Sequence, residues 1–417
     1  MGRPFKRQKD MGFNSIKINK LDGSLGGGQA TDRIAVMVLG CGAIGSTLAI
    51  GKAYKLLQLS DAEALGITES RDAAEGRLDY YHLSEAFRLS PDSQVWVTAV
   101  AGTAKVSDLK NDANLIAAIR SIDGVNTIAV AGLTKDTDVT AAVTGAQLLV
   151  DRLKDDHIYI DAILLEGVGD YISEAISTWT DLRPLASPNV SVIIGRDTKV
   201  AASNAAYAKH AAVGSALGML LVRAVHENLG SVDIETKPSA SRGQQDYPLS
   251  DVKRGLFMDA SLSNGIAYNK LSVADQRQID QFGYIYIGAF DGYAGYYFSN
   301  SHTAEKSYSD YCFIERNAVW NKAARIIRKT LIPRIRSKVE ANPATGYIKG
   351  TTIDSWKRRC LRALEPMVVA GNCASVDVQI DEKQAAVSSV PFKIGVRIVA
   401  DGVVHEFEVD LGFTNKI

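Results

Sequence analysis

The chain has 417 residues, of which 46% are hydrophobic and 23% are charged, and its 47 Lys and Arg residues balance its 47 Asp and Glu residues. This length exceeds what one hydrophobic core usually organises, so we expect two domains, or one domain with a large insertion. The neutral balance excludes a chain-wide attraction to nucleic acid or to membranes, and partners have to be sought in local patches.

The cysteines and histidines give no sign of a metal or catalytic site. Cys41, Cys312, Cys360 and Cys373 are widely scattered and form no CxxC pair, so reduced thiols are predicted rather than a zinc site or a disulfide framework. The six histidines show no HExxH or comparable spacing, and no catalytic serine or cysteine signature is present. We therefore expect a protein that is not an enzyme and needs no cofactor.

Residues 1–30 are predicted to form an N-terminal arm on a flexible tether. The first ten residues are basic, but no apolar run follows them, so no signal peptide is predicted. In the short extended segment FNSIKIN, which begins at Phe13, Ile16 and Ile18 share one face. A Gly-rich stretch at residues 23–28 follows, and it is typical of a flexible linker.

Residues 31–230 are predicted to form an α/β domain with a mainly parallel sheet, because short apolar segments alternate with helical patterns. The apolar segments lie at residues 34–39, 95–100, 127–132, 158–165 and 190–195. The most apolar stretch, residues 211–225, is too short to span a bilayer and contains Arg223. It predicts a buried helix, and no membrane insertion is expected.

A glycine-rich turn in this domain suggests an alternative function. In IAVMVLGCGAIGS, Gly40, Gly42 and Gly45 follow a predicted strand and are predicted to open an apolar helix, as a dinucleotide-binding turn does. That fold also needs an acidic residue about 20 residues further on. Ser60 and Glu63, which lie there, match a helix capping box instead. An NAD(P)-dependent oxidoreductase using the Gly40–Gly45 turn stays as the alternative.

Residues 231–417 are predicted to form a second domain of α+β type. The segments FGYIYIGAF and AGYYFSNS flank Asp291-Gly292, a pair that favours a tight hairpin turn. Near the C-terminus, the odd positions from 403 to 413 are Val, His, Phe, Val, Leu and Phe, while Glu406, Glu408 and Asp410 occupy even positions. We expect them to pair with residues 393–398 through a turn at Asp401-Gly402, beside a third strand at residues 376–380.

A strongly basic stretch separates the two β regions. From Arg316 to Arg362 the chain has thirteen Lys or Arg residues against two acidic ones, Glu340 and Asp354. Apolar residues at helical spacing from Val319 to Val339 predict a helix that Pro333 bends, and residues 353–364 predict a second helix. Such a face needs an acidic partner. A nucleic acid is the weaker candidate, because no nucleic-acid-binding module accompanies the patch, whereas an acidic protein surface would suit it.

The two ends of the chain favour an assembly. An extended arm and a terminal hairpin both offer unpaired strand edges, which soluble monomers normally avoid. If neighbouring subunits fill these edges by strand addition, the contact is heterologous and propagates into rings or helical polymers.

Several segments, in the same order along most of the chain, resemble the contractile tail sheath proteins of bacteriophages and related contractile injection particles, most closely a Mu-like sheath group of Bacteroidetes. The matching segments are FNSIKINKLDGSLG, YKLLQLSDAEALGI, YYHLSEAFRLSPDSQVWV, GYYFSNSHTAEKSYSDYCFIERNAVWNKAARIIRK and IDSWKRRCLRALEPM. Asn317 stands where the family pattern has an apolar residue.

The resemblance implies a C-terminal sheath core that is completed by the N-terminal arm and by exchanged terminal strands, with the α/β domain inserted or peripheral. It implies hexameric rings that stack helically around an inner tube with an acidic outer surface, contract to drive the tube through a cell envelope, and meet baseplate and tail terminator proteins. The particle would be a virion tail or injection device assembled in the bacterial cytoplasm.

The same resemblance assigns roles to particular residues. The implied tube contacts are Lys357, Arg358, Arg359 and Arg362, followed by Lys322, Arg325, Arg328 and Lys329. The implied positions of strand exchange between subunits are Phe13, Ile16 and Ile18 in the arm, and Phe407, Val409 and Leu411 near the C-terminus.

Overall fold

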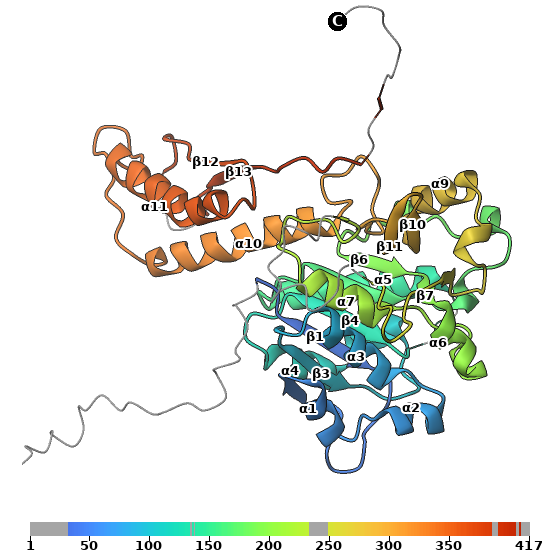
Figure 1. The fold of residues 1–417 in the computed structure, drawn as a ribbon. Coiled ribbons are helices and arrows are strands. Elements are labelled where there is room, and N and C mark those ends of the chain that lie inside the picture. The colour runs from blue at the N-terminus through green and yellow to red at the C-terminus, as the bar shows by residue number, and fades with distance from the viewer. Residues whose placement is uncertain are drawn as a thin grey trace, which may run out of the picture.

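The structure is a computed structural model that describes residues 32–133, 136, 138–232, 249–385, 391–405 and 408–409. A layered α/β part carries most of these residues, and a smaller part projects from one side of it (Figure 1). We call residues 32–321 the body and residues 322–399 the lobe. Among the helices of the described residues, none is both long and apolar enough to cross a membrane.

A seven-stranded sheet forms the centre of the body. Its strands lie in the order β2-β3-β1-β4-β5-β6-β9, and all are parallel to their neighbours except β2, which is antiparallel to β3. The strands are β1 (Ala35–Leu39), β2 (Ala53–Leu56), β3 (Val95–Ala99), β4 (Thr127–Ala131), β5 (Ala162–Glu166), β6 (Val190–Ile193) and β9 (Tyr284–Ile285). All five predicted apolar segments supply a strand, and the predicted α/β architecture is confirmed.

Helices cover both faces of this sheet. Successive side chains of a strand point to opposite faces, so in β1 Val36 and Val38 enter one apolar cluster while Ala35 and Met37 enter the other. The first cluster includes α4 (Ala113–Arg120) and α5 (Val139–Asp155), and the second includes α1 (Leu59–Ala64), α3 (Asp79–Leu89) and α7 (Val213–Leu221). The helix predicted at residues 211–225 is α7, and every residue of α7 is buried.

Smaller elements complete the body. The short helices are α2 (Glu69–Glu75), α6 (Thr198–Ser203) and α9 (Val273–Phe282), and single 3₁₀ turns occur at Val106–Asn111, Gly169–Tyr171, Ile176–Thr178, Arg183–Leu185, Ala205–Tyr207 and Tyr268–Lys270. Two antiparallel pairs lie outside the large sheet: β7 (Gly195–Asp197) with β8 (Ala260–Leu262), and β10 (Ile287–Phe290) with β11 (Tyr293–Phe298).

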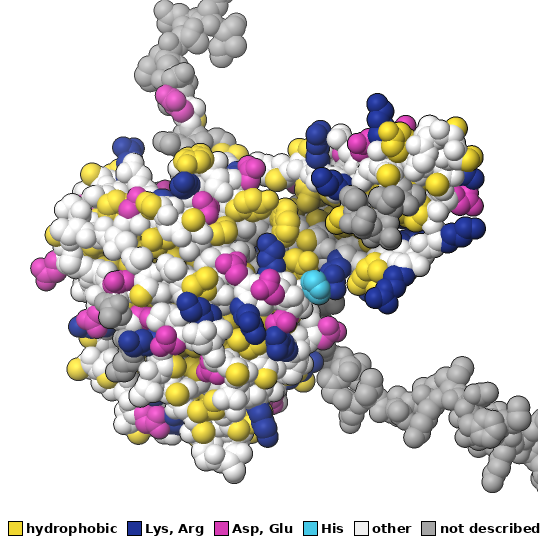
Figure 2. All heavy atoms as spheres, turned by 180° about the vertical axis from the view of Figure 1, so that it is seen from behind, with side chains coloured by type: hydrophobic (Ala, Val, Ile, Leu, Met, Phe, Trp, Pro, Cys, Tyr) yellow, Lys and Arg dark blue, Asp and Glu magenta, His cyan; other side chains and the backbone are white. Residues whose placement is uncertain are grey.

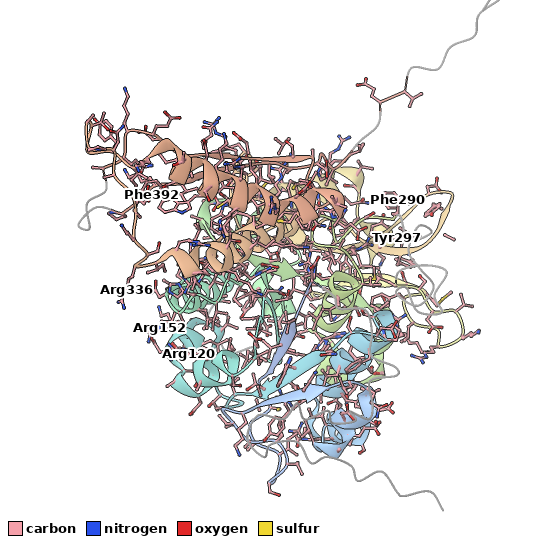
Figure 3. The ribbon with its side chains drawn as sticks, turned by 90° about the vertical axis from the view of Figure 1, so that its left-hand side faces the viewer. Arg120, Arg152, Phe290, Tyr297, Arg336 and Phe392 are labelled. Carbon is pink, nitrogen blue, oxygen red and sulfur yellow. The ribbon has the colours of Figure 1, made fainter. Side chains whose placement is uncertain are left out.

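The β10–β11 pair confirms the hairpin predicted at Asp291-Gly292, where Gly292 has a positive φ of 75°. Figure 3 places its residues Phe290 and Tyr297 on the side of the molecule opposite to Arg336 and Arg152. The hairpin and the basic residues after α10 therefore belong to different surfaces.

The glycine-rich turn after β1 does not open a helix, so this part of the dinucleotide-binding prediction is wrong. Residues 40–52 contain turns and isolated bridges, and β2 follows them. A Cβ on Gly40 would lie 2.5 Å from Cδ2 of Leu133 and 2.7 Å from the carbonyl oxygen of Gly132. The glycine therefore permits a close approach of two chain segments, and no helix N-terminus is available for a pyrophosphate.

The cap of the next helix also differs from the prediction. Gln58, rather than Ser60, precedes the first residue of α1, and Asp61 accepts hydrogen bonds from the backbone N–H groups of Leu57 (2.8 Å) and Gln58 (3.2 Å). The acidic residue that caps α1 is thus Asp61, two residues earlier than the predicted Glu63.

Two long helices and a small sheet form the lobe and its connection to the body. α10 (Ile314–Leu331) begins inside the body and ends at a 3₁₀ turn, Ile332–Arg334. Pro333 therefore ends the helix instead of bending it, because it cannot donate a backbone hydrogen bond. α11 (Gly350–Val369) contains the second predicted helix, and β12 (Ser375–Gln379) pairs antiparallel with β13 (Gly395–Val399).

The predicted terminal hairpin is wrong in the part that the structure describes. β13 pairs with β12 rather than with the residues after Asp401-Gly402, and residues 401–405 and 408–409 belong to no strand. Residues 401–405 and 408–409 have no strand partner within the described residues, so the alternating sequence does not lead to strand pairing there. The division of the chain at residue 230 stays a prediction; the large sheet itself takes β9 from beyond that position.

Candidate functional site

Buried amide side chains fix α10 to the body. Asn317 donates from Nδ2 to the carbonyl oxygens of Pro188 (2.7 Å), Tyr311 (3.0 Å) and Phe313 (3.1 Å). One turn later, Asn321 donates to the carbonyl oxygen of Ile160 at 2.9 Å. Asn317 therefore replaces an apolar residue with a group that satisfies three backbone acceptors.

A buried carboxylate continues this connection. Asp161 is fully buried, and its Oδ1 accepts hydrogen bonds from Asn321 Nδ2 at 3.0 Å and from Arg325 Nη1 at 3.1 Å. Burial raises the pKa of Asp161, and the positive charges of Arg325 and Arg33 oppose that rise. Because removing one member of a buried ion pair leaves the other uncompensated, this cluster ties α10 firmly to the end of β5.

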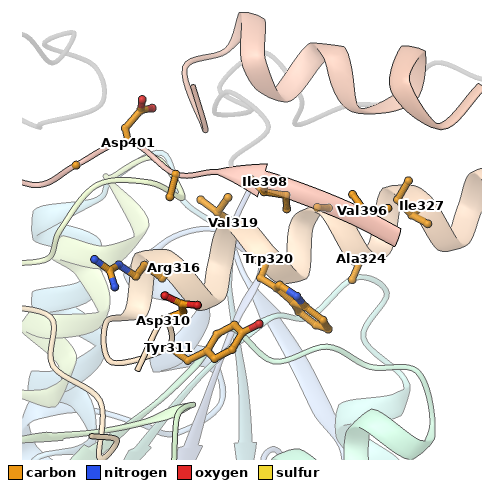
Figure 4. A pocket seen from close by; sticks show the side chains of 13 residues that line it. Asp310, Tyr311, Arg316, Val319, Trp320, Ala324, Ile327, Val396, Ile398 and Asp401 are labelled. Carbon is orange, nitrogen blue, oxygen red and sulfur yellow. The ribbon is translucent and has the colours of Figure 1, made fainter. Parts of the chain in front are cut away.

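A groove lies between α10 and β13, with a volume of about 640 Å³ (Figure 4). Its walls are partly apolar: Val319, Ala323 and Ile327 face it from α10, and Val396 and Ile398 face it from β13. The other lining residues are Asp310, Tyr311, Arg316, Trp320, Ala324, Ala400, Asp401 and Gly402. Figure 2 shows apolar side chains gathered in the angle between the body and the lobe.

The strand that borders this groove is at a sheet edge. Within the described residues β13 has one strand neighbour, β12, and its side chains alternate between half-buried and exposed. An edge strand with unpaired N–H and C=O groups is a template for another strand. The groove and the edge together could accept an extended segment with alternating apolar side chains.

The predicted tube-contact residues fall into two groups. Lys322 donates to Asp32 (2.5 Å) and Asn372 (2.7 Å), and Arg325 binds Asp161, so both side chains are engaged within the chain. The remaining residues are exposed or half-buried, and within the described part of the chain none of them forms a salt bridge: Arg328, Lys329, Lys357, Arg358, Arg359 and Arg362. Figure 3 shows that Arg336, beyond the end of α10, lies on the same side as Arg152 and Arg120 of the body.

The predicted strand-exchange residues cannot be placed together. Phe13, Ile16, Ile18, Phe407 and Leu411 lie outside the described residues, and Val409 is 78% exposed. Sequence reasoning missed the groove and the Asp161 cluster. The nearest signal was the apolar stripe of the basic helix, which contributes Val319, Ala323 and Ile327 to the groove.

The described residues contain no candidate metal site. Among them, no group of three or more His, Cys, Asp or Glu side chains is arranged to hold a metal ion, and all four cysteines are free thiols. Burial raises the pKa of the Cys41 thiol to about 12, which leaves it protonated and weakly nucleophilic at neutral pH.

Comparison with solved structures identifies the fold as that of contractile sheath and injection-system proteins. A chain of the anti-feeding prophage (AFP) baseplate matches with a TM-score of 0.57 at 12% identity, covering 98% of this chain and 100% of the other. A chain of the PVC sheath complex in the contracted state, from an extracellular contractile injection system, gives 0.55 at 13% identity, covering 98% and 99%. The sheath tail protein of Desulfitobacterium hafniense gives 0.51 at 11% identity, covering 93% and 100%.

The chain belongs to the DUF2586 family, whose N-terminal domain matches residues 13–302 and whose C-terminal domain matches residues 310–417. No curated protein matches the chain. The resemblance to sheath proteins that the sequence indicated is confirmed at the level of the fold.

Proposed function

We propose that the chain is a structural subunit of a contractile tail sheath. The observation that carries the proposal is that the whole chain, body and lobe together, has the fold of solved proteins from contractile sheaths and injection systems. The subunits polymerise as stacked hexameric rings around an inner tube, and the stack contracts to drive the tube through a cell envelope. Baseplate and tail terminator proteins meet its two ends, in a virion tail or injection particle assembled in the bacterial cytoplasm.

The N-terminal arm of one subunit fills the α10–β13 groove of another. Ile16 and Ile18 alternate with polar residues, as a strand needs when one of its faces covers Val396 and Ile398. On the face that it shares with Ile16 and Ile18, the arm carries Lys20, and the charged residues that line the groove are two acids, Asp310 and Asp401, and one base, Arg316. The alternating apolar side chains of the arm supply the contact area, and the opposite charges favour the arm over other segments as the occupant of the groove.

The arm proposal can be tested with Trp320, which lines the groove and is 40% exposed. Residues 1–20 are deleted, and a synthetic peptide of residues 12–21 is then added to the truncated protein. We expect the deletion to abolish polymerisation without unfolding the subunit, and the peptide to shift the fluorescence of Trp320 to shorter wavelength because the ring loses water. Electron microscopy and circular dichroism measure assembly and folding.

Two controls make this test decisive. A peptide with Ile16→Ser and Ile18→Ser should bind at least about tenfold more weakly, because two apolar side chains are lost. A Trp320→Phe protein should bind the peptide without the spectral shift, which separates the signal of Trp320 from those of Trp96, Trp179 and Trp356. Unimpaired tubes after the deletion, or equal binding of both peptides, would reject arm exchange.

The exposed basic face of α11 contacts the acidic outer surface of the tube. Arg358, Arg359 and Arg362 are exposed, and all three lie within about one turn of the same helix. Replacing the three with Glu should reduce co-sedimentation with the tube protein by about tenfold or more and remove its salt dependence. Lys270→Glu with Arg277→Glu, two exposed bases of the body, is the matched control. Equal losses in both variants would reject a specific contact.

A further inference from the structure

A second pocket lies in the body, at a position where α/β sheets often bind ligands. The parallel strands β1, β3, β4, β5 and β6 follow the chain as first to fifth, and in the sheet they lie in the order 2-1-3-4-5. The chain therefore reverses its direction of winding between β1 and β4. In sheets of this order the carboxyl ends of the strands at the reversal leave a crevice.

The pocket lies one strand beyond this reversal, at the carboxyl ends of β4 and β5, and has a volume of about 270 Å³. Gly132 and Glu166, at the carboxyl ends of β4 and β5, line it together with His82 of α3 and His210 of the loop before α7. Its other lining residues are Gly76, Arg77, Leu78, Asp79, Val168, Asp170, Ala206, Tyr207 and Lys209. A Cβ on Gly132, whose φ is +72°, would lie 2.6 Å from Nη2 of Arg77, so the glycine lets the guanidinium lie against the strand end.

The charged groups of the pocket satisfy one another. Asp79, which is 1% exposed, accepts hydrogen bonds from Arg77 at 2.7 and 3.1 Å and from Arg71 at 3.3 Å. Glu166 accepts from the backbone N–H groups of Gly132 (2.8 Å) and Ala211 (3.2 Å), and Lys209 pairs with Asp170 at the rim. The charged residues of the lining therefore all have partners within the chain, and an ionic ligand would have to displace one of these contacts.

His210 is the exception. Its ring is 6% exposed, and Nδ1 donates to the carbonyl oxygen of Tyr207 at 2.5 Å. Burial lowers the pKa of His210 to about 4, so the ring is neutral and Nε2 carries a lone pair. Within the described residues, Nε2 is buried and has no hydrogen-bond partner. An unpartnered buried acceptor is unfavourable unless a ligand or a water donates to it.

The neighbouring histidine is already engaged. Nδ1 of His82 accepts from the backbone N–H of Gly214 at 3.3 Å, and its Nε2 lies 3.8 Å from Oε1 of Glu166. His82 therefore orients Glu166 at one wall of the pocket. Among the described residues of this wall, Nε2 of His210 is the buried acceptor that lacks a partner.

We infer that this pocket binds a small uncharged polyol, one of whose hydroxyl groups donates to Nε2 of His210. A hydroxyl both donates and accepts, which suits a pocket that combines a free acceptor with the N–H groups of Arg77. A single water, which takes up about 30 Å³ in the liquid, would fill little of the pocket. The volume lies at the lower end of the range for small-molecule sites, about 300 Å³, so the ligand is no larger than a monosaccharide. This site is additional to the proposed sheath function and does not depend on it.

Isothermal titration calorimetry of the full chain tests the inference. The probes are glycerol, D-ribose and D-glucose, with inorganic phosphate and ammonium as charged comparisons. We expect saturable binding of at least one polyol and neither ion. His210→Leu should weaken that binding about tenfold, since one buried hydrogen bond is lost. His210→Gln keeps an acceptor and should bind more tightly than His210→Leu.

The control is His157→Asn, which replaces an exposed histidine outside the pocket lining with a residue that tolerates its positive φ of 63°, and it should leave binding unchanged. Absence of polyol binding, preferential binding of phosphate or ammonium, or equal affinity of His210→Leu and the unmodified protein would overturn the inference. If His210→Leu does not fold, a density map of the full chain with the polyol decides: the molecule must lie within hydrogen-bond distance of His210 Nε2, and a position elsewhere overturns the inference.

Discussion

The body and the lobe bury their apolar surface to different extents. In the body, both faces of the large sheet are covered, and strands such as β1, β4 and β5 consist of buried residues throughout. In the lobe, the cluster around Cys360 and Leu364 is bordered by half-buried residues, among them Ile327, Val396 and Ile398. The body closes its own core, whereas the lobe keeps apolar surface that a segment of another chain can cover.

The largest expected loss of stability comes from the cluster that joins the two regions. Asp161→Ala leaves Arg325 without its buried partner, so we expect the free energy of unfolding to fall by about 4 kcal/mol. Urea denaturation measures the loss. Asp156→Ala removes a partly exposed pair with Arg120 and should cost less than about 1 kcal/mol. A small loss for Asp161→Ala would mean that the junction is not held by this charge.

The dense packing of the body predicts the next effect. A Cβ on Gly214 would lie 2.2 Å from the carbonyl oxygen of His82 and 2.4 Å from its Cα, between α7 and α3. Gly214→Ala should therefore destabilise the protein by about 3 kcal/mol. In the lobe, Gly350 has nothing within 4 Å of its Cβ position, and Gly350→Ala should leave the midpoint of thermal unfolding unchanged or slightly higher. Equal losses of stability in Gly214→Ala and Gly350→Ala would mean that packing at these two glycines does not differ between the body and the lobe.

Replacing a buried acid of the body, Asp72, should raise the stability of the folded protein rather than lower it. Burial raises the pKa of Asp72 from 3.8 to about 6, although the backbone N–H of Tyr81 donates to it at 3.1 Å. The folded protein therefore holds a proton that the unfolded chain releases, and the stability from this group falls as pH rises from about 4 to about 6. Asp72→Asn should stabilise the protein by about 2 kcal/mol at pH 7 and have little effect at pH 4.

The measurement is urea denaturation at both pH values. Comparing the variant with the unmodified protein at each pH removes the contribution of other titrating groups, such as His210. A gain of the same size at pH 4 would mean that the amide packs better and that the charge of Asp72 is not the cause.

The last comparison lies within the lobe, at two valines that face each other across β12 and β13. Val378 is fully buried, and its partner Val396 is half-buried at the groove. Val378→Thr should cost about 2 kcal/mol because its hydroxyl is buried, and Val396→Thr less than about 1 kcal/mol. Only Val396→Thr should impair polymerisation out of proportion to its effect on folding. Sedimentation of the polymer tests this expectation. If Val378→Thr impaired polymerisation more than Val396→Thr relative to its loss of stability, the groove would not be an assembly surface.

The part of the fold that sequence reasoning predicted is the part with strong local patterns. β1 and β3 to β6 are short apolar runs because both faces of the sheet are covered. β2, with the sequence AYKL, carries a polar residue at the sheet edge, and β9 has only two residues. Neither strand therefore has a run of apolar residues from which it could be predicted. The glycines after β1 matched a motif, but Gly40 serves close packing against Gly132 and Leu133, and Gly42 and Gly45 adopt positive φ values of 71° and 50°.

The candidate site was less accessible to prediction because distant segments build it. The groove joins residues 310–327 with residues 396–402, and Asn321 meets Asp161 across 160 residues of sequence. No local pattern encodes such a meeting. The charge pattern marked the basic residues as one group, and only the contacts of Lys322 and Arg325 separate those that hold α10 in place from those that are exposed.

α10 passes from the body into the lobe without a break, and this continuity has a mechanical consequence. The helix has 18 residues, a length of about 27 Å, and its first half is anchored by Asn317 and Asn321. A rigid rod held at one end amplifies small rotations: turning the body by about 10° displaces the far end of such a helix by about 5 Å, which is roughly the spacing between neighbouring strands. A rotation of the body by this amount would therefore move the lobe by about the distance between two strands.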